Sequence, residues 1–97
     1  MAYDPGAIEA TLAAAVGDDP QLIVELRIAF LDSAEGALAA MAAARDKEQW
    51  RAAAWRLTSL AASFGAARLM ALASQAVQAD EPDAALLGKL RRMIARL

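Results

Sequence analysis

The chain has 97 residues, of which 59% are hydrophobic, and it contains no cysteine and no histidine. Its length fits one domain spanning residues 1–97. Its formal net charge of −2 argues against a nucleic-acid partner, because proteins that bind nucleic acid carry a basic face. Without cysteine there is no disulfide framework and no thiolate metal site. Without histidine, the Ser-His-Asp triad, histidine metal ligation and phosphoryl transfer through histidine are all excluded.

The sequence gives no sign of membrane targeting or of a cofactor. No apolar run approaches the ~20 residues that a membrane span needs. The start, MAYDPGAIEA, lacks the basic region and apolar core of a signal peptide. No glycine-rich phosphate loop, metal-ligand spacing or nucleophile motif is present, and the carboxylates Asp32 and Glu35 fit a solvated helix face. We therefore expect a cytoplasmic protein with no membrane contact and no cofactor, which is not an enzyme.

Two start signals open the predicted helices of the first half. Asp4-Pro5 reads as an N-cap followed by proline at the first helical position, and Gly17 is a natural stop for this short helix. Asp19-Pro20 repeats the signal and opens a long helix that we expect to reach about Arg45. Its predicted buried stripe follows the helical period and consists of Leu22, Leu26, Phe30, Ala34, Leu38 and Met41.

Three further helices are predicted in the second half. Asp46 is the next cap, with Gln49 at the capping-box spacing, and Gly65 interrupts the helix that follows. The segment ADEPDAA is the last break, with Asp80 or Glu81 expected as the cap and Pro82 near the first turn. The predicted buried stripes are Trp50, Ala54, Leu57, Ala61 and Phe64; then Leu69, Leu72, Ala73, Ala76 and Val77; then Leu86, Leu87, Leu90, Ile94 and Leu97.

No segment alternates between apolar and polar residues with a period of two, so no strand is expected. Short connections favour antiparallel neighbours. The predicted fold is all-α: an antiparallel four-helix bundle with a short additional N-terminal helix.

Trp55 does not belong to the buried stripe of its helix. At about 100° per residue, Phe64 lies about 180° from it and Leu57 about 160° away. We therefore expect Trp55 to point outward or into a groove beside a neighbouring helix. Tryptophan is enriched among the residues that dominate protein interfaces, inside a rim of small neutral side chains. The alternative is a half-buried ring on which the Arg51 guanidinium stacks. The expected surface around Trp55 is Arg51, Arg56, Thr58, Ser59 and Ala62.

The stretch from Ala54 to Ala66, AWRLTSLAASFGA, resembles the signature of histidine-containing phosphotransfer (HPt) domains. That signature reads approximately A-H-x-L-K-G-S-x-x-x-x-G-A, and Ala54, Leu57, Gly65 and Ala66 match it. The Asp19-Pro20 opening, FLDSA at 30–34, and the pattern of Leu69 and Leu72 are also similar to the family. The resemblance implies a four-helix bundle and a role in phosphorelay signalling, in which such domains meet receiver domains and histidine kinases.

The residues that carry the family's chemistry are replaced. Trp55 stands at the position of the phosphorylatable histidine, Thr58 at that of a lysine and Ser59 at that of a glycine. The indole nitrogen only donates hydrogen bonds, so it does not accept a phosphoryl group as imidazole does. The periodicity predicts that all three replacements share one exposed face.

Two functions remain open. The first is an HPt-like domain that binds a receiver or histidine-kinase domain without relaying phosphate, as a decoy, adaptor or inhibitor. The alternative is a self-associating bundle no longer tied to phosphorelay, in which a homodimer buries two copies of the Trp55 patch. The basic residues of the last helix, Lys89, Arg91, Arg92 and Arg96, are expected mainly to suit the helix dipole.

Overall fold

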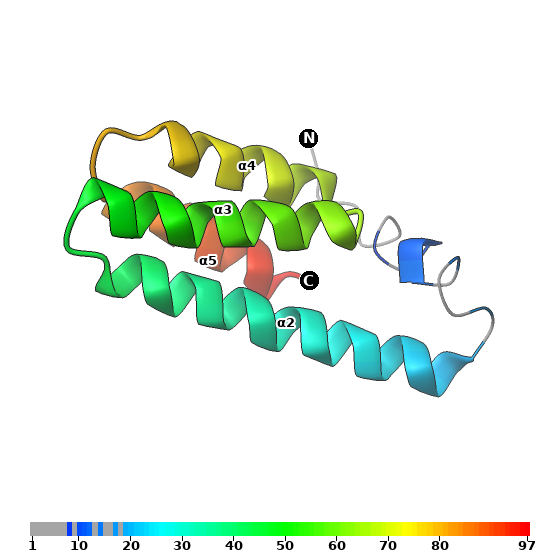
Figure 1. Cartoon of the computed structure of the whole chain (residues 1–97). Coiled ribbons are helices and arrows are strands. Elements are labelled where there is room, and N and C mark those ends of the chain that lie inside the picture. The colour runs from blue at the N-terminus through cyan, green and yellow to red at the C-terminus, as the bar shows by residue number, and fades with distance from the viewer. Residues whose placement is uncertain (1–7, 9, 13, 15–16, 18) are drawn as a thin grey trace.

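The computed structural model describes residues 8, 10–12, 14, 17 and 19–97, and all the regular structure in them is helical. The helices are α2 (Pro20–Ala43), α3 (Lys47–Ser63), α4 (Ala67–Gln78) and α5 (Ala84–Ala95), shown in Figure 1. Ile8 and Leu12 of the predicted first helix are buried, at 1% and 3% exposure. Asp4 and Pro5, the predicted start of that helix, lie outside the described residues.

The predicted N-caps of α2 and α3 are confirmed. Asp19 accepts hydrogen bonds from the backbone N–H groups of Gln21 and Leu22 at 3.1 and 3.2 Å. Asp46 accepts from the N–H of Gln49 at 2.8 Å. The Gln49 side chain reaches back one residue further than in a capping box, and accepts from the N–H of Arg45 at 2.8 Å. These bonds satisfy donors that a helix start otherwise leaves without partners.

Gly65 ends α3, as predicted, through a Schellman motif. The N–H of Gly65 donates to the Ala62 carbonyl at 3.3 Å, and that of Ala66 donates to the Ala61 carbonyl at 2.9 Å. Gly65 has φ of +71°, a left-handed conformation in which a Cβ is unfavourable. The turn reverses the chain, so α4 returns antiparallel along α3.

The predicted start of α5 is wrong. Its N-cap is Asp83, whose carboxylate accepts from the N–H of Leu86 at 3.1 Å. Asp80 and Glu81 lie in the preceding loop and Pro82 lies outside the helix. Asp80 is excluded as the cap because Glu81 would then be the first helical residue, and the ring of a proline disfavours the helical conformation in the residue before it. Glu81 itself is not of a residue type preferred at an N-cap, whereas Asp83 is.

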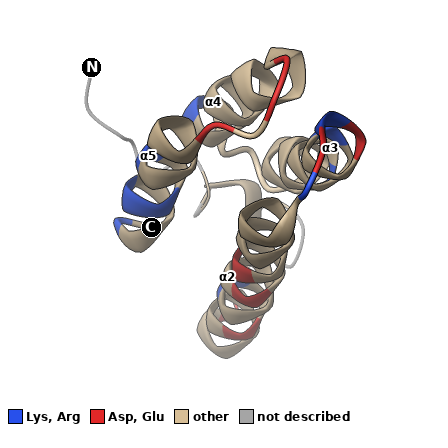
Figure 2. Cartoon of the chain, turned by 90° about the vertical axis from the view of Figure 1, so that its left-hand side faces the viewer, with Lys and Arg blue, Asp and Glu red and all other residues tan. Residues whose placement is uncertain are grey.

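One apolar core lies between the four helices. Helix α3 packs against α2 and α4, and α5 packs against the same two helices on the other side. Figure 2 shows the arrangement from one end. The predicted stripes are buried in large part, with Leu26, Phe64, Leu72 and Leu97 only partly covered. The fully buried members include Phe30, Leu38, Trp50, Leu57, Leu69, Leu90 and Ile94.

The N-terminal half of α2 leaves large apolar side chains exposed. Leu22, predicted to be buried, is 37% exposed. Val24 and Ile28, which lie outside the predicted stripe, are 53% and 54% exposed. In Figure 1 this half of α2 extends past the ends of α3 and α4. Where a helix is longer than its neighbours, its apolar side chains stay uncovered even when their spacing fits a buried stripe. None of the described helices is long and apolar enough to cross a membrane.

Candidate functional site

The two tryptophans of α3 have opposite environments. Trp50 is 1% exposed, and its indole N–H donates to the Ala76 carbonyl of α4 at 2.8 Å. Trp55 is 54% exposed, as its angle on the helix predicted. Five residues correspond to about 140° around the helix, which separates the core side from the outer side. The exposed ring of Trp55 is therefore the largest apolar group on the outer face of α3.

Arg51 lies one turn before Trp55 and reaches towards α4. Its side-chain Nε–H donates to the Val77 carbonyl at 3.2 Å. The carbonyls of Ala76 and Val77 belong to the last turn of α4, where carbonyls lack the usual N–H partners of the helix interior, and the Ala76 carbonyl also accepts from the backbone N–H of Ala79 at 3.2 Å. Trp50 and Arg51 thus cap the C-terminus of α4, and a cation suits that end of the helix dipole. Arg51, expected as a partner-binding residue, stabilises the α3–α4 pair while its side chain stays exposed.

Thr58 does not lie on the exposed face, contrary to the prediction. It is 8% exposed, and its hydroxyl donates to the Ala54 carbonyl one turn earlier at 2.8 Å. The reason is the close packing of α4 along that side of α3. A position about 60° from Trp55 is outward on an isolated helix, but here it falls under the neighbouring helix. Thr58 is a packing residue that no partner reaches.

The remaining predicted site residues are exposed. Ser59 and Ala62 lie on the outer face of α3, together with Ala52, and Arg56 is exposed on the side that faces α2. Ala52, Ser59 and Ala62 are small and neutral. Trp55 consequently protrudes above short neighbouring side chains, and the cations Arg51 and Arg56 lie on either side of it. We call Trp55, Ala52, Ser59 and Ala62 the Trp55 face.

A small apolar hole opens at the C-terminal end of this face. It has a volume of about 130 Å³ and is lined by Ala61, Ala62, Gly65, Ala67 and Met70. Met70 of α4 is 36% exposed at its rim. The hole exists because the turn after α3 places a glycine and alanines where larger side chains would fill the space. The hole was not predicted from the sequence, although Gly65 marks the turn and Met70 follows five residues later.

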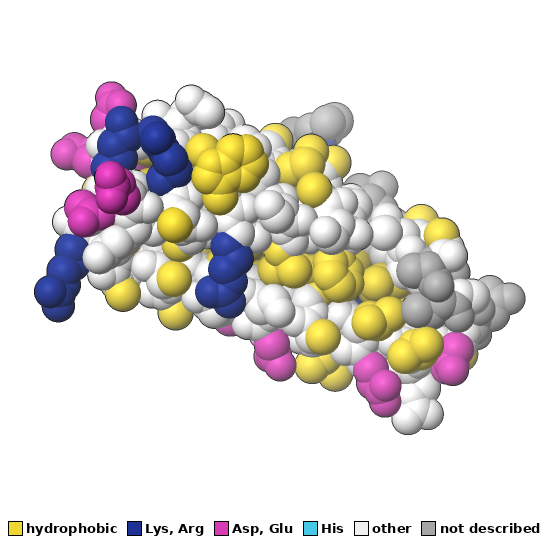
Figure 3. Space-filling model, in the orientation of Figure 1, with side chains coloured by type: hydrophobic (Ala, Val, Ile, Leu, Met, Phe, Trp, Pro, Cys, Tyr) yellow, Lys and Arg dark blue, Asp and Glu magenta, His cyan; other side chains and the backbone are white. Residues whose placement is uncertain are grey.

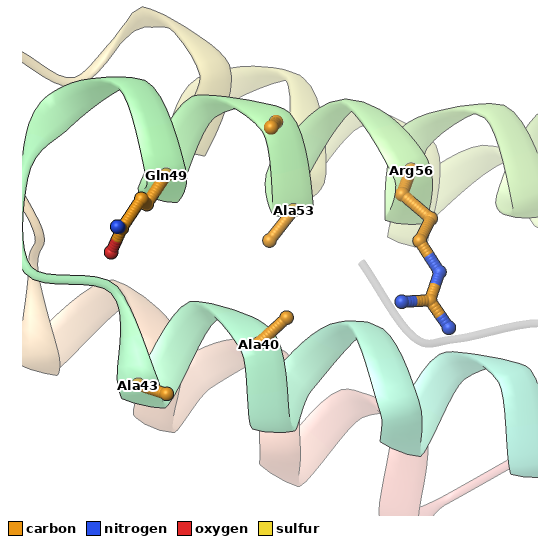
Figure 4. A pocket seen from close by; sticks show the side chains of 6 residues that line it. Ala40, Ala43, Gln49, Ala53 and Arg56 are labelled. Carbon is orange, nitrogen blue, oxygen red and sulfur yellow. The ribbon is translucent and has the colours of Figure 1, made fainter.

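A wider groove lies on the other side of α3, against α2. Its volume is about 500 Å³, and Ala40, Ala43, Gln49, Ala52, Ala53 and Arg56 line it. Figure 4 shows the alanines of the two helices facing one another, with Gln49 at one end and Arg56 at the other. Arg56 lies directly over Gly36, where a Cβ would stand 2.9 Å from its Nη2. Within the part of the chain that the structure describes, no ion pair is formed by Arg56.

Charges are segregated over the molecule (Figure 2): basic residues gather on α5, and acidic residues on α2 and in the α4–α5 loop. The exposed pair Lys47–Asp80, 3.7 Å apart, contributes little to stability because water screens it. Among the described residues, no three acidic side chains come close enough to hold a metal ion. Comparison of the chain with models of protein families, with curated proteins and with solved structures gives no match.

Proposed function

We propose that this chain is an HPt-like four-helix bundle domain that binds a receiver or histidine-kinase domain without relaying phosphate. The observation that carries the proposal is the exposure of Trp55, at 54%, at the position where the resembling family keeps its histidine. The resemblance in Ala54, Leu57, Gly65 and Ala66 supports the same scaffold. In such a domain the partner would be held and no phosphoryl group would be passed on. The protein would then act as a decoy, adaptor or inhibitor in the cytoplasm.

The chemistry of the Trp55 face suits this role. A large, rigid aromatic ring buries much apolar area and loses little conformational freedom when it docks. The small neighbours Ala52, Ser59 and Ala62 let a partner surface approach the ring closely. Arg51 and Arg56 add positive charge on both flanks, which complements an acidic partner surface and speeds its approach. Trp55 is therefore assigned as the anchor, and the two arginines as the residues that orient the partner.

The test is a binding titration against the receiver and histidine-kinase domains encoded by the same genome, each immobilised in turn. Wild type should bind at least one of them, and Trp55→Ala should weaken binding at least about 30-fold, the effect of an interface hot spot. Ile28→Ala is the matched control, because Ile28 of α2 is equally exposed at 54% and is not part of the Trp55 face. The proposal would be refuted if wild type bound none of these domains, or if both variants lost the same amount of binding affinity.

A further inference from the structure

A protruding ring and an apolar hole lie on the same outer face of α3. Trp55 forms the ring, and Ala62, on the rim of the hole, follows seven residues later. Seven residues are about two helical turns, or about 10.5 Å along the axis. Figure 3 shows hydrophobic side chains gathered in neighbouring groups over α3 and α4. The ring is too far along the helix to enter the hole of its own chain, so both remain open.

The hole has the size and chemistry for one aromatic ring. Its volume is about 130 Å³, and an apolar cavity of about 150 Å³ is known to hold a benzene molecule. All five lining residues are alanine, glycine or methionine. Methionine adapts its shape and makes favourable contacts with aromatic rings. The six-membered ring of an indole is thus a suitable occupant.

We propose that two copies of this chain associate around a two-fold axis, with Trp55 of each copy seated in the hole of the other. In such an interface residue i contacts residue j, and residue j contacts residue i. A ring and a hole that lie on one face satisfy this condition when the two α3 helices cross antiparallel. The axis then passes near Ser59, between Trp55 and Ala62. Ser59 is small and exposed, so the helices can approach closely at the crossing point.

The centre of this stretch is uncharged, as a two-fold pairing requires. Trp55, Ser59, Ala62 and the residues that line the hole are all uncharged. A side chain that lies on the two-fold axis meets its own equivalent, so a charge there would meet a like charge. Arg51 and Arg56 lie to the sides of this stretch, Arg51 towards α4 and Arg56 towards α2. No charge therefore lies on the axis itself.

The area available predicts a weak dimer. Helix α3 has 17 residues and is about 26 Å long, and with α4 beside it the face is about 20 Å wide. This gives about 500 Å² per copy, below the about 800 Å² per partner of a stable complex. We expect a dissociation constant on the order of tens of micromolar. The dimer covers Trp55, so it competes with the proposed partner binding, but it is tested on the chain alone.

Sedimentation equilibrium tests the pairing. Between about 5 µM and about 1 mM, a range that brackets such a dissociation constant, the mass of the wild type should rise from 10.2 kDa towards twice that value. Trp55→Ala and Ala62→Glu should each weaken association at least about 10-fold. Ala42→Glu, an equivalent change at an exposed position of α2, should leave it unchanged. A wild type that stays monomeric, or that forms masses above the dimer, would overturn the two-fold pairing.

A mixing experiment tests which residues meet. Trp55→Lys and Ala62→Glu should each be poorly associating alone. Mixed in equal amounts, they should form a heterodimer, because one native ring-and-hole contact is kept and the other becomes a Lys–Glu pair. We expect the mixture to associate at least about 5-fold more tightly than either variant alone. A mixture no tighter than its components would overturn the proposed contact between positions 55 and 62. Circular dichroism of each variant checks that the helices are intact.

Discussion

At the scale of single residues, the two tryptophans of α3 differ in environment and in assigned role: Trp50 stabilises the fold, and Trp55 is the proposed anchor for a partner. Trp50 fills the core and satisfies a carbonyl at the end of α4 with its indole N–H. Trp55 is half exposed, and no hydrogen bond of its indole N–H is found among the described residues. We therefore expect substitution of tryptophan to affect the free energy of unfolding differently at these two positions, which are only five residues apart.

The first prediction compares Trp50→Phe with Trp55→Phe. Trp50→Phe removes the bond to the Ala76 carbonyl in the core, and should lower the free energy of unfolding by about 1–3 kcal/mol. Trp55→Phe changes a surface residue and should alter it by less than about 0.5 kcal/mol. Urea unfolding followed by circular dichroism measures both without depending on tryptophan fluorescence. Equal losses of stability in the two variants would contradict this division of roles.

The angular positions around the axis of α3 predicted the exposure of Trp55 correctly and that of Thr58 wrongly. The difference has a physical cause. Trp55 lies near the centre of the outer face of α3, so no plausible position of α2 or α4 covers it completely. Thr58 lies about 60° to one side, where coverage depends on how closely α4 approaches. That distance is set by small residues of α4 such as Ala73, fully buried in the core. The spacing of apolar residues in α3 alone contains no information about the distance between α3 and α4.

At the scale of helices, glycine occurs both at a helix end and in helix interiors, where it lowers the stability of the helix. Gly65 has φ of +71° at the end of α3 and is needed for the turn. Gly36 and Gly88 lie inside α2 and α5, where glycine has no conformational advantage. A Cβ at Gly88 would stand 3.4 Å from the Arg92 guanidinium, an ordinary contact with a flexible side chain. The three glycines therefore serve different purposes despite their identical side chains.

The second prediction is that alanine has opposite effects at two of these positions. Gly88→Ala should raise the free energy of unfolding by up to about 1 kcal/mol, because alanine is the stronger helix former. Gly65→Ala should lower it by about 1–2 kcal/mol, because a Cβ is unfavourable in the left-handed conformation. Thermal unfolding of the two variants beside wild type measures the signs. Stabilisation by Gly65→Ala would contradict the assigned turn.

Helix boundaries were predictable where a single cap stood alone. Asp19 and Asp46 each precede one clear helical pattern, and both cap as expected. The start of α5 offered Asp80, Glu81 and Asp83 within four residues, and the pattern of charges favoured no single choice. Pro82 excludes Asp80 through its steric effect on Glu81, and the preference for aspartate at an N-cap selects Asp83 over Glu81. Local composition predicts that a helix begins in such a segment, and backbone sterics together with side-chain capping select the residue.

At the scale of the whole molecule, the all-helical fold and its short connections followed from the sequence, while the hole and the α2–α3 groove did not. The groove forms where alanines of α2 and α3 face one another (Figure 4), and the hole is lined by alanines and a glycine at the turn between α3 and α4. Alanine strongly favours helix but fills little space, so an alanine-rich chain gives clear helices and unfilled surfaces. Which alanines face each other depends on helix pairing, which the pattern of one helix does not encode.

The third prediction tests the scaffold with the double variant Trp55→His, Ser59→Gly, which restores the family's residues at the two replaced positions that are exposed. Thr58 is buried and is left unchanged. An exposed imidazole at position 55 can accept a phosphoryl group from a receiver aspartyl phosphate. The double variant should therefore acquire acid-labile label from a phosphorylated receiver domain, and wild type should acquire none. Ser59→Gly alone is the control without imidazole. Label on wild type, or none on the folded double variant with any receiver, would contradict the HPt-like assignment.

The most direct test of the central claim is a fluorine NMR titration. Both tryptophans are replaced by 5-fluorotryptophan, and Trp55→Phe identifies which of the two resonances belongs to Trp55. Unlabelled receiver and histidine-kinase domains are then added at one fixed concentration of the chain. We predict that at least one domain shifts or broadens the Trp55 resonance while that of Trp50, 1% exposed, stays in place. If every domain leaves the Trp55 resonance unchanged, or a domain that binds moves only Trp50, the claim is wrong.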